Sequence, residues 1–365
     1  MQLDLLQHVD EATVSQPSRR PRAVAPRIRY IGSKARVSDA LLDLIGPPRT
    51  PGERFVDLFC GGGSVSKAAA ARGWSVHTND HLVSSVIIAR AQLLSAKQLS
   101  FDRAGGYERV IKLLNTAAPE NGPIFREYSP SGLSRAGEIR KYFTETNAQK
   151  IDGVRAAIEN QFRSGRFGEH ERTLLIADLM CAANSVANIA GTYGCFLSRW
   201  TAPALSEFRM VPREIPRELP PSTLSVLDAF EFCDERADTL YCDPPYTKRQ
   251  YAAYYHLLET IALGDDPYVV GISGIRPWEH KASPFCYRRR ALHAFEDLLN
   301  TKRARRVFIS YSSEGHVKLE QLVAALGRFG SLQVHNLQTV RRYAPNEVSR
   351  QGPKEVREFL LQLDR

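Results

Sequence analysis

The chain has 365 residues, of which 43% are hydrophobic and 24% are charged, a composition that excludes a mainly disordered or fibrous protein. Forty-nine basic residues against 40 acidic ones give a net charge of +9, which favours a polyanion or an acidic surface as partner. A generally arginine-rich composition gives the same positive charge without implying any such partner. The six cysteines contain no CxxC pair, which argues against a zinc cluster or a disulfide framework, so we expect no metal.

The chain shows no run of eighteen or more uncharged apolar residues, and its start lacks a secretory layout. We therefore expect a cytoplasmic protein without a membrane partner. Prolines and arginines follow one another between residues 16 and 26, which predicts a flexible basic arm over residues 1–28.

Short apolar runs followed by turn residues and helical stretches recur after a helix that we expect over Arg36–Ile45. This alternation predicts an α/β fold with a parallel sheet and crossover helices. The last two runs are joined without a helix, so we expect them to form an antiparallel hairpin at the sheet edge. The seven expected strands are Phe55–Phe59, Ser75–Thr78, Leu224–Leu227, Thr239–Cys242, Val307–Tyr311, Leu332–Val340 and Val356–Leu363.

The alternation stops between the second and third expected strands, where helical periodicity takes over. Ile151–Phe162 and Arg172–Ile189 carry apolar faces at helical spacing, and prolines between residues 212 and 221 close the segment. We therefore expect an inserted, mainly helical domain over residues 101–215. The flanking segments 29–100 and 216–365 would together form the α/β domain.

A glycine-rich turn follows the first strand and leads directly into a helix. Gly61 and Gly63 there let the backbone approach a ligand and aim helix N–H groups at it, although a tight turn needs glycine as well. Asp80 follows the second strand, where an acid can accept both ribose hydroxyls. These features predict a nucleotide-type ligand and suit NAD and S-adenosylmethionine equally.

The fourth strand ends in Asp243, Pro244, Pro245 and Tyr246, which favours the second ligand. An exocyclic amine donates two protons, and the Asp243 carboxylate and the Pro244 carbonyl can each accept one of them. The nitrogen lone pair is then free to attack a methyl group while Tyr246 stacks on the base. The structural alternative is a strand-ending acid followed by a rigid turn.

These motifs resemble the DNA adenine methylase family, the α-group of adenine-N6 DNA methyltransferases. The resemblance rests on Arg29–Lys34, Asp57–Val65 and Asp243–Tyr246, which stand in the family's order, with the long insertion before the last. It implies a Rossmann-like S-adenosylmethionine methyltransferase sheet whose insertion recognises the target in double-stranded DNA. It implies S-adenosylmethionine as the methyl donor, and it leaves open whether a cognate restriction endonuclease acts separately.

The resemblance also assigns residues to the methyl donor. Tyr30 and Lys34 are expected near its methionine end, where Lys34 would pair with the carboxylate. Asp80 would bind the ribose, and Asp228 would contact the adenine amino group. The remaining donor-binding residues that the resemblance implies are Asp57, Phe59, Gly61 and Gly63.

Four residues are the DNA contacts that we expect. Lys248 and Arg249 follow the Asp-Pro-Pro-Tyr motif and stand among aromatic residues, a mixture that tracks a backbone and stacks on bases. Tyr193 and Arg199 lie in a stretch that resembles family sequence next to the recognition domain. For His256 we favour a structural or positioning role over general-base catalysis, because the methylated amine sheds its proton readily to water.

The sequence therefore predicts a site-specific enzyme that flips an adenine out of duplex DNA and methylates its N6 amine. Two other substrates, the N4 amine of cytosine and adenine in RNA, suit the same motifs. A catalytically idle DNA-binding module on the same fold is the alternative from another class.

Overall fold

The computed structural model describes residues 28, 30–132, 134–135, 137–233, 237–341 and 355–365. The expected basic arm, except for Ile28, lies outside the described residues. None of the described helices is both long enough and apolar enough to cross a lipid bilayer.

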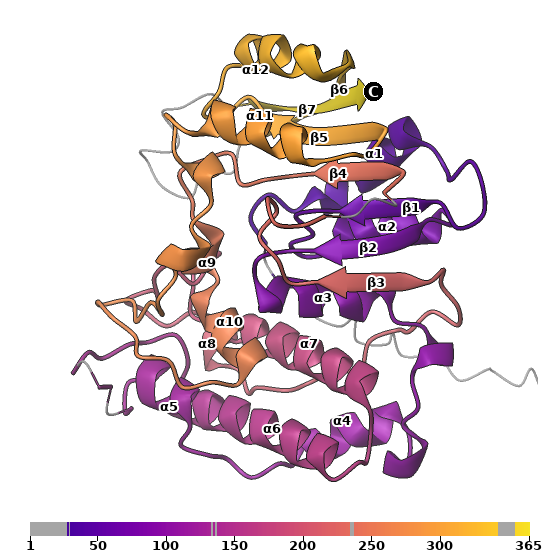
Figure 1. The fold of residues 1–365 in the computed structure, drawn as a ribbon. Coiled ribbons are helices and arrows are strands. Elements are labelled where there is room, and N and C mark those ends of the chain that lie inside the picture. Colours follow the sequence, from indigo (N-terminus) through magenta and orange to yellow (C-terminus); the bar gives the residue numbers. More distant parts are fainter. Residues whose placement is uncertain (1–27, 29, 133, 136, 234–236, 342–354) are drawn as a thin grey trace, which may run out of the picture.

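A seven-stranded mixed sheet forms the centre of the molecule (Figure 1). Its strand order is β3-β2-β1-β4-β5-β7-β6, in which β7 runs antiparallel to both neighbours and the other pairs are parallel. This order confirms the predicted Rossmann-like methyltransferase sheet with a terminal hairpin. The strands are β1 Arg54–Asp57, β2 Ser75–Asn79, β3 Ser222–Ser225, β4 Thr239–Cys242, β5 Arg306–Ser312, β6 Ser331–Arg341 and β7 Glu355–Asp364.

The third strand begins two residues earlier than its apolar run suggested. Its register is set by β2, because Ser222 pairs with Val76 and Ser225 pairs with Asn79. Leu224 and Leu227 are 45% and 40% exposed, so this apolar run does not mark a buried strand. Since β3 pairs with a single neighbour at the sheet edge, hydrogen bonding to β2 decides its position.

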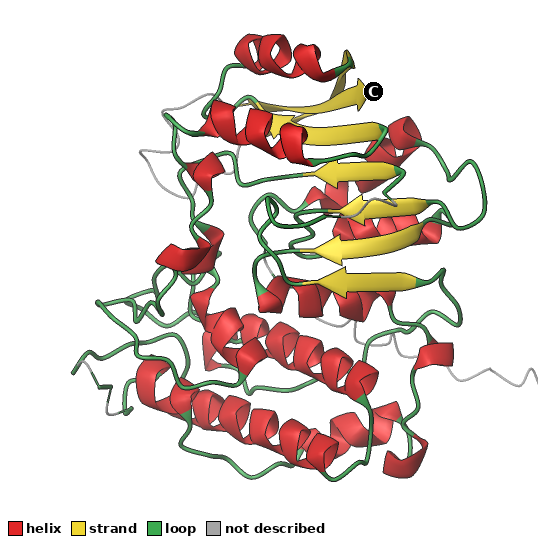
Figure 2. Cartoon of the chain, in the orientation of Figure 1, coloured by secondary structure: helices red, strands yellow, loops and turns green. Residues whose placement is uncertain are grey.

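Helices cover both sides of the sheet (Figure 2), and because alternate residues of each strand face opposite sides, each side has its own core. Phe55 and Tyr241 pack on one side, while Val56 and Leu240 pack on the other. The helices that cover these two sides alternate with the strands along the chain. They are α1 Ser38–Ile45 and α2 Ser64–Ala71 on the first side, and α11 Ala291–Thr301 and α12 Leu319–Leu326 on the second.

A helical layer lies beyond the β3 edge of the sheet (Figure 1). Its residues come from the expected insertion, which the structure confirms as helical: α4 Tyr107–Asn115, α5 Pro123–Tyr128, α6 Glu145–Arg163, α7 Glu169–Ser185 and α8 Ala202–Leu205. Its core also contains residues of α3 Val83–Leu93 and α10 His256–Leu263, which lie outside the insertion. The bounds 101–215 therefore remain a prediction. The remaining short helices are α9 Tyr251–Tyr254, η1 Lys34–Arg36, η2 Ala96–Gln98, η3 Asp102–Ala104, η4 Glu279–Lys281, η5 Pro284–Cys286 and η6 Gly327–Phe329.

Candidate functional site

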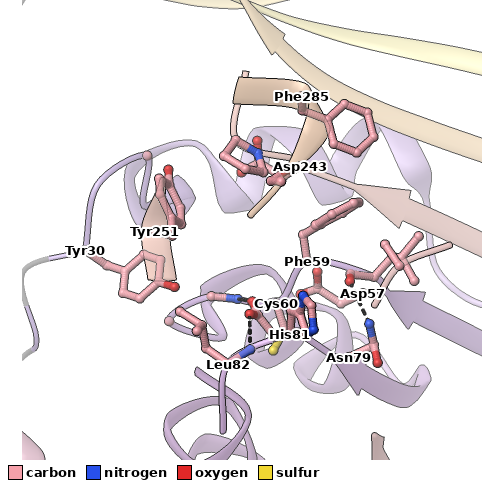
Figure 3. A pocket seen from close by; sticks show the side chains of 18 of the residues that line it. Tyr30, Asp57, Phe59, Cys60, Asn79, His81, Leu82, Asp243, Tyr251 and Phe285 are labelled. Carbon is pink, nitrogen blue, oxygen red and sulfur yellow. Dashed lines mark hydrogen bonds between the residues drawn. The ribbon is translucent and has the colours of Figure 1, made fainter. Parts of the chain in front are cut away.

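A pocket of about 950 Å³, counted to its open mouth, lies at the carboxyl ends of β1, β2 and β4. Ligands of open α/β sheets bind at this edge. Figure 3 shows Asp243 on one side of the pocket, Tyr30 and Tyr251 together on another, and Phe59 beside Phe285. The predicted site residues that line the pocket are Tyr30, Lys34, Asp57, Phe59, Gly61, Asp80, Asp228, Asp243 and Pro245.

The glycine turn is shaped by close packing on both of its sides. Gly61 has φ +47°, and a Cβ built there would lie 2.8 Å from Cε1 of Tyr30. Gly63 has φ +73°, and its Cβ would lie 2.6 Å from the Cα of Ala89 on α3. A side chain at either position would therefore collide with a ring or with helix backbone. Gly63 acts through this packing, since it is not among the described residues that line the pocket.

Tyr30 covers the glycine turn and is itself held by two tyrosines. Its ring stacks on Tyr255 with centroids 4.4 Å apart and meets the edge of Tyr251 at 5.7 Å. The Tyr30 hydroxyl lies 2.8 Å from Oγ of Ser85, and the backbone N–H of Ile31 donates to the Tyr255 hydroxyl. This aromatic group fixes the segment before η1 against α3, α9 and α10.

Two carboxylates, the buried Asp57 and the half-buried Asp80, lie at the ends of the first two strands. Asp80 accepts hydrogen bonds from the backbone N–H groups of Gly61 and Leu82, each at 3.0 Å, so it ties the second strand to the glycine turn. Asp57 accepts from Oγ of Ser66 through Oδ2 at 2.5 Å, while its buried Oδ1 has no hydrogen-bond partner among the described residues. Burial raises the pKa of Asp57 to about 7 and that of Asp80 to about 6.

Three phenylalanines form an apolar wall near Asp228. Phe285 stacks on Phe230 with centroids 5.8 Å apart and meets the edge of Phe59 at 5.8 Å. Asp228 lies three residues beyond the end of β3, and its Oδ1 accepts from the Phe230 backbone N–H at 2.8 Å. Its Oδ2 lies 3.6 Å from Nδ1 of His81. The three rings and the Asp228 carboxylate line the same pocket.

Lys34 lines the pocket at its Asp243 end, and its expected pairing with the methionine carboxylate of a donor stays a prediction. Its ammonium lies 3.1 Å from Oδ1 of Asp243 and 3.4 Å from Oε2 of Glu358 on β7, and it donates to the Tyr246 hydroxyl at 3.3 Å. Burial raises the pKa of Asp243 to about 6, Lys34 lowers it, and Glu358 raises it. The carboxylate is therefore ionised at neutral pH.

The loop of the Asp-Pro-Pro-Tyr motif is held by hydrogen bonds from two later parts of the chain. The Cys286 thiol donates to the Pro245 carbonyl, and the His316 backbone N–H donates to the Tyr246 carbonyl at 3.0 Å. The Tyr246 ring is half-buried against Tyr311, with centroids 5.2 Å apart. Neither Tyr246 nor the buried Pro244 is among the described residues that line the pocket.

The structure separates the four expected DNA contacts. Lys248, Arg249 and Arg199 are exposed, as a phosphate contact requires. The Tyr193 side chain is completely buried, and its hydroxyl donates to Oδ1 of Asn184. The expectation of a DNA contact from Tyr193 is therefore wrong for this structure. An aromatic residue followed by glycine fits a packed turn as well as an exposed one, and sequence does not separate the two.

His256 is also completely buried, among the aromatic residues of the helical layer. Its Nε2 donates to the Tyr193 carbonyl at 2.9 Å, and its Nδ1 lies 3.4 Å from the Tyr128 hydroxyl. Burial lowers the pKa of His256 to about 4, so the ring is neutral at physiological pH. These contacts support the structural role that we expected.

The model of the D12 class N6 adenine-specific DNA methyltransferases matches residues 30–323, which include the glycine turn and the Asp-Pro-Pro-Tyr motif. The chain belongs to this family. The resemblance found in the sequence is thereby confirmed.

Three curated relatives of this D12-class protein are methylases, and each matches most of this chain. It is 33% identical over 350 residues to modification methylase LlaI of Lactococcus lactis subsp. lactis, covering 92% of this chain and 54% of that protein. It is 30% identical over 345 residues to type II methyltransferase M.FokI of Planomicrobium okeanokoites, covering 93% and 53%. The chain thus spans about half the length of these two relatives. It is 31% identical over 307 residues to type II methyltransferase M.NlaIII of Neisseria lactamica, covering 83% and 89%.

A solved structure, magnesium protoporphyrin IX methyltransferase from Synechocystis with bound SAM, aligns with 90% of this D12-class chain and 79% of its own chain. The TM-score is 0.36 and the sequence identity is 11%.

Several pocket residues of this D12-class protein escaped prediction. Phe230, Phe285, Tyr251 and Lys281 line the pocket, and Glu358 reaches Lys34 from β7. Of these residues, only Phe230 carried a signal in the sequence. It lies two positions after Asp228, whose side chain caps the turn and so keeps Phe230 close to it. The others come from segments whose approach to the pocket depends on the tertiary fold.

Proposed function

We propose that this chain transfers the methyl group of S-adenosylmethionine to the N6 amine of an adenine that has left the stack of duplex DNA. The observation that carries the proposal is that the glycine turn and Asp243 line one pocket. A methyl donor held at Gly61 and an amine held at Asp243 would meet there.

The residues present fit the donor. Asp57 offers a buried carboxylate oxygen without a hydrogen-bond partner, which suits the ammonium group of an amino-acid moiety. Phe59, Phe230 and Phe285 offer an apolar wall on which a purine could stack, and Asp228 lines the same pocket and could accept from an exocyclic amine. When bound, the donor supplies a methyl group on a positively charged sulfur.

The target amine would be held by Asp243. The Asp243 carboxylate would accept a hydrogen bond from one N–H of the amine and the Pro244 carbonyl a hydrogen bond from the other, which directs the nitrogen lone pair towards the methyl group. Because the pKa of Asp243 is about 6, it accepts a hydrogen bond at neutral pH and loses this capacity in acid. The methyl-transfer rate should therefore rise as the pH rises through about 6.

The amine must leave the base pair to reach this pocket. A stacked and paired base cannot present its nitrogen in line with the donor at bonding distance, so base flipping is required. The exposed Lys248 and Arg249 follow the Asp243 loop directly and would contact the phosphate backbone at the pocket mouth. Cognate restriction endonuclease activity, if a partner supplies it, would act on the same DNA separately.

The test is transfer of tritiated methyl groups from S-adenosylmethionine to genomic DNA from a host without adenine or cytosine methylases. The DNA is then hydrolysed, and the labelled base is identified by chromatography. We expect N6-methyladenine, and we expect Asp243→Ala to lower the rate by about 10²-fold or more while the Kd for the donor changes little. Glu320→Gln, a change at an exposed acid on α12, should keep full activity.

Each other outcome points to a defined alternative. Label in N4-methylcytosine would change the target base, and label in RNA but not in DNA would change the polymer. If the wild-type protein binds DNA and transfers no methyl group, the idle module is correct. Equal rates for wild type and Asp243→Ala would remove Asp243 from the mechanism.

A further inference from the structure

A cluster of four polar side chains, of which Lys34 is buried and the other three are half-buried, includes the proposed target-site residue Asp243. The Lys34 ammonium contacts Asp243 at 3.1 Å, Glu358 at 3.4 Å and the Tyr246 hydroxyl at 3.3 Å. Lys34 is 5% exposed, Asp243 16% and Glu358 17%. The cluster joins η1, the loop after β4, and β7, three parts of the chain that are far apart in sequence.

Glu358 is placed there by the sheet. It lies on β7, where it pairs with Ser312 at the end of β5 and with Gln338 on β6. Its Oε2 is buried without a hydrogen-bond partner among the described residues, so the ion pair with Lys34 is its compensation. A buried carboxylate with so little compensation is unfavourable for stability, which points to a role in the site.

We propose that Glu358 is a positioning residue of the active site, which holds the Lys34 ammonium against Asp243 and leaves the cluster with a net negative charge towards the target amine. The proposal rests on the function proposed above. With Asp243 and Glu358 ionised, two carboxylates face one ammonium, so one negative charge remains uncompensated. Methyl transfer leaves a positive charge on the amine nitrogen until a proton departs to water, and a fixed negative charge nearby stabilises that state.

Lys34 serves as a fixed donor in this arrangement and not as a proton carrier. Burial alone would lower its pKa, but Asp243 and then Tyr246 raise it, and the pKa ends well above the ordinary value. The group therefore stays an ammonium at neutral pH. Without Glu358, this ammonium would keep Asp243, the Tyr246 hydroxyl and the Gly32 carbonyl at 3.5 Å as partners, but no second carboxylate, and its position along the Asp243 carboxylate would be less restricted.

Glu358 and Lys34 should also move the titration of Asp243 in opposite directions. A negative neighbour disfavours ionisation of a carboxyl group and a positive neighbour favours it. Loss of the Glu358 charge would lower the pKa of Asp243, and loss of the Lys34 charge would raise it. The charged and titratable groups that interact with Asp243 are Lys34, Glu358, Asp57, Cys242, Tyr241, Tyr246 and Tyr251.

The test measures single-turnover methyl transfer between pH 5 and pH 9 for wild type, Glu358→Gln, Glu358→Asp and Lys34→Met. For Glu358→Gln we expect the plateau rate to fall by about 10-fold or more, and the acid limb of the profile to move to lower pH. The donor Kd should stay within about threefold of wild type. Glu358→Asp should recover part of the plateau, and Lys34→Met should move the acid limb to higher pH.

Two outcomes would overturn the proposal. A Glu358→Gln profile with an unmoved acid limb and a plateau within twofold of wild type would show that Glu358 does not act on Asp243. A Glu358→Gln protein that loses donor binding together with activity would show a purely structural role. Both outcomes leave the proposed function intact, whereas a wild-type protein that methylates no DNA would refute the proposed function itself.

Discussion

The contact between the glycine turn and α3 allows a sharp test of how the donor pocket is built. Gly63→Ala introduces a Cβ at a residue with φ +73°, 2.6 Å from the Cα of Ala89. The left-handed backbone alone is unfavourable for alanine by about 1 to 2 kcal/mol, and the loss of glycine freedom in the unfolded chain offsets about 0.4 to 1 kcal/mol of that. The collision adds about 1 to 3 kcal/mol, as in overpacked cores, because the obstacle is helix backbone and not a movable side chain.

Gly52→Ala is the matched control for this substitution. Gly52 has φ +87°, close to that of Gly63, and a Cβ built there meets nothing within 4 Å. The free energy of unfolding of the Gly52→Ala variant should therefore fall by only about 1 kcal/mol, which is the backbone contribution alone. The difference between the two variants measures the collision of Gly63 with α3.

The two variants are compared by urea denaturation and by calorimetric titration with S-adenosylmethionine. We expect Gly63→Ala to lower the free energy of unfolding by about 1 to 3 kcal/mol more than Gly52→Ala, and to weaken donor binding at least tenfold. Equal destabilisation by both substitutions would refute the close approach of α3 to the turn. Unchanged donor affinity in Gly63→Ala would show that this approach does not shape the pocket.

Three further predictions follow from other buried or exposed charges. Asp57→Asn should raise the free energy of unfolding at pH 8, because burial raises the pKa of Asp57 to about 7 and the ionised carboxylate therefore destabilises the folded wild type. This gain should vanish as the pH falls from about 7 to about 4, because the folded wild type then takes up a proton at Asp57. Arg140→Met should lower the free energy of unfolding by about 3 to 5 kcal/mol in urea, since it removes a fully buried guanidinium 3.2 Å from the buried Glu127 carboxylate. Lys248→Ala and Arg249→Ala should each reduce the salt dependence of DNA binding by about one ion, measured as the slope of log Kd against log salt concentration.

Each of these predictions has a control and an opposing outcome. Asp102→Asn, at an exposed acid, should show no gain at pH 8, and a gain for Asp57→Asn that is independent of pH would contradict its raised pKa. Arg163→Met, at an exposed arginine, should change the free energy of unfolding by less than about 0.5 kcal/mol. Donor affinity should be unaffected in Lys248→Ala, and an unchanged salt slope would place this lysine outside the DNA contact.

The sheet and the pocket motifs could be predicted because local sequence determines them. Apolar runs bounded by turn residues mark buried strands such as β1 and β4, and glycines directly after β1 mark a turn that no side chain fits. The position of the edge strand β3 was harder to predict from the sequence. Hydrogen bonds to β2 place β3 at Ser222–Ser225, and both Leu224 within the strand and Leu227 beyond it stay exposed.

The charges of the site show where sequence reading stops. A lysine upstream of a glycine motif can pair with any carboxylate that the fold brings to it, and Lys34 meets Asp243 and Glu358 because β7 enters the sheet beside β5. Tyr193 looks like an exposed aromatic in its polar stretch, yet its backbone N–H bonds to the Tyr254 carbonyl and its ring is buried. The ion pairs of Lys34 and the burial of Tyr193 depend on contacts between distant segments, which local sequence patterns do not reveal.

The strand order has a consequence for how the protein is made. β7 lies between β5 and β6, so β6 reaches its native place in the sheet only after β7, which is synthesised later, has paired with β5. A nascent chain that ends before β7 therefore presents the open backbone edge of β5, and such edges attract other strands. We expect ribosome-bound intermediates of this length to be chaperone clients and to aggregate when released early.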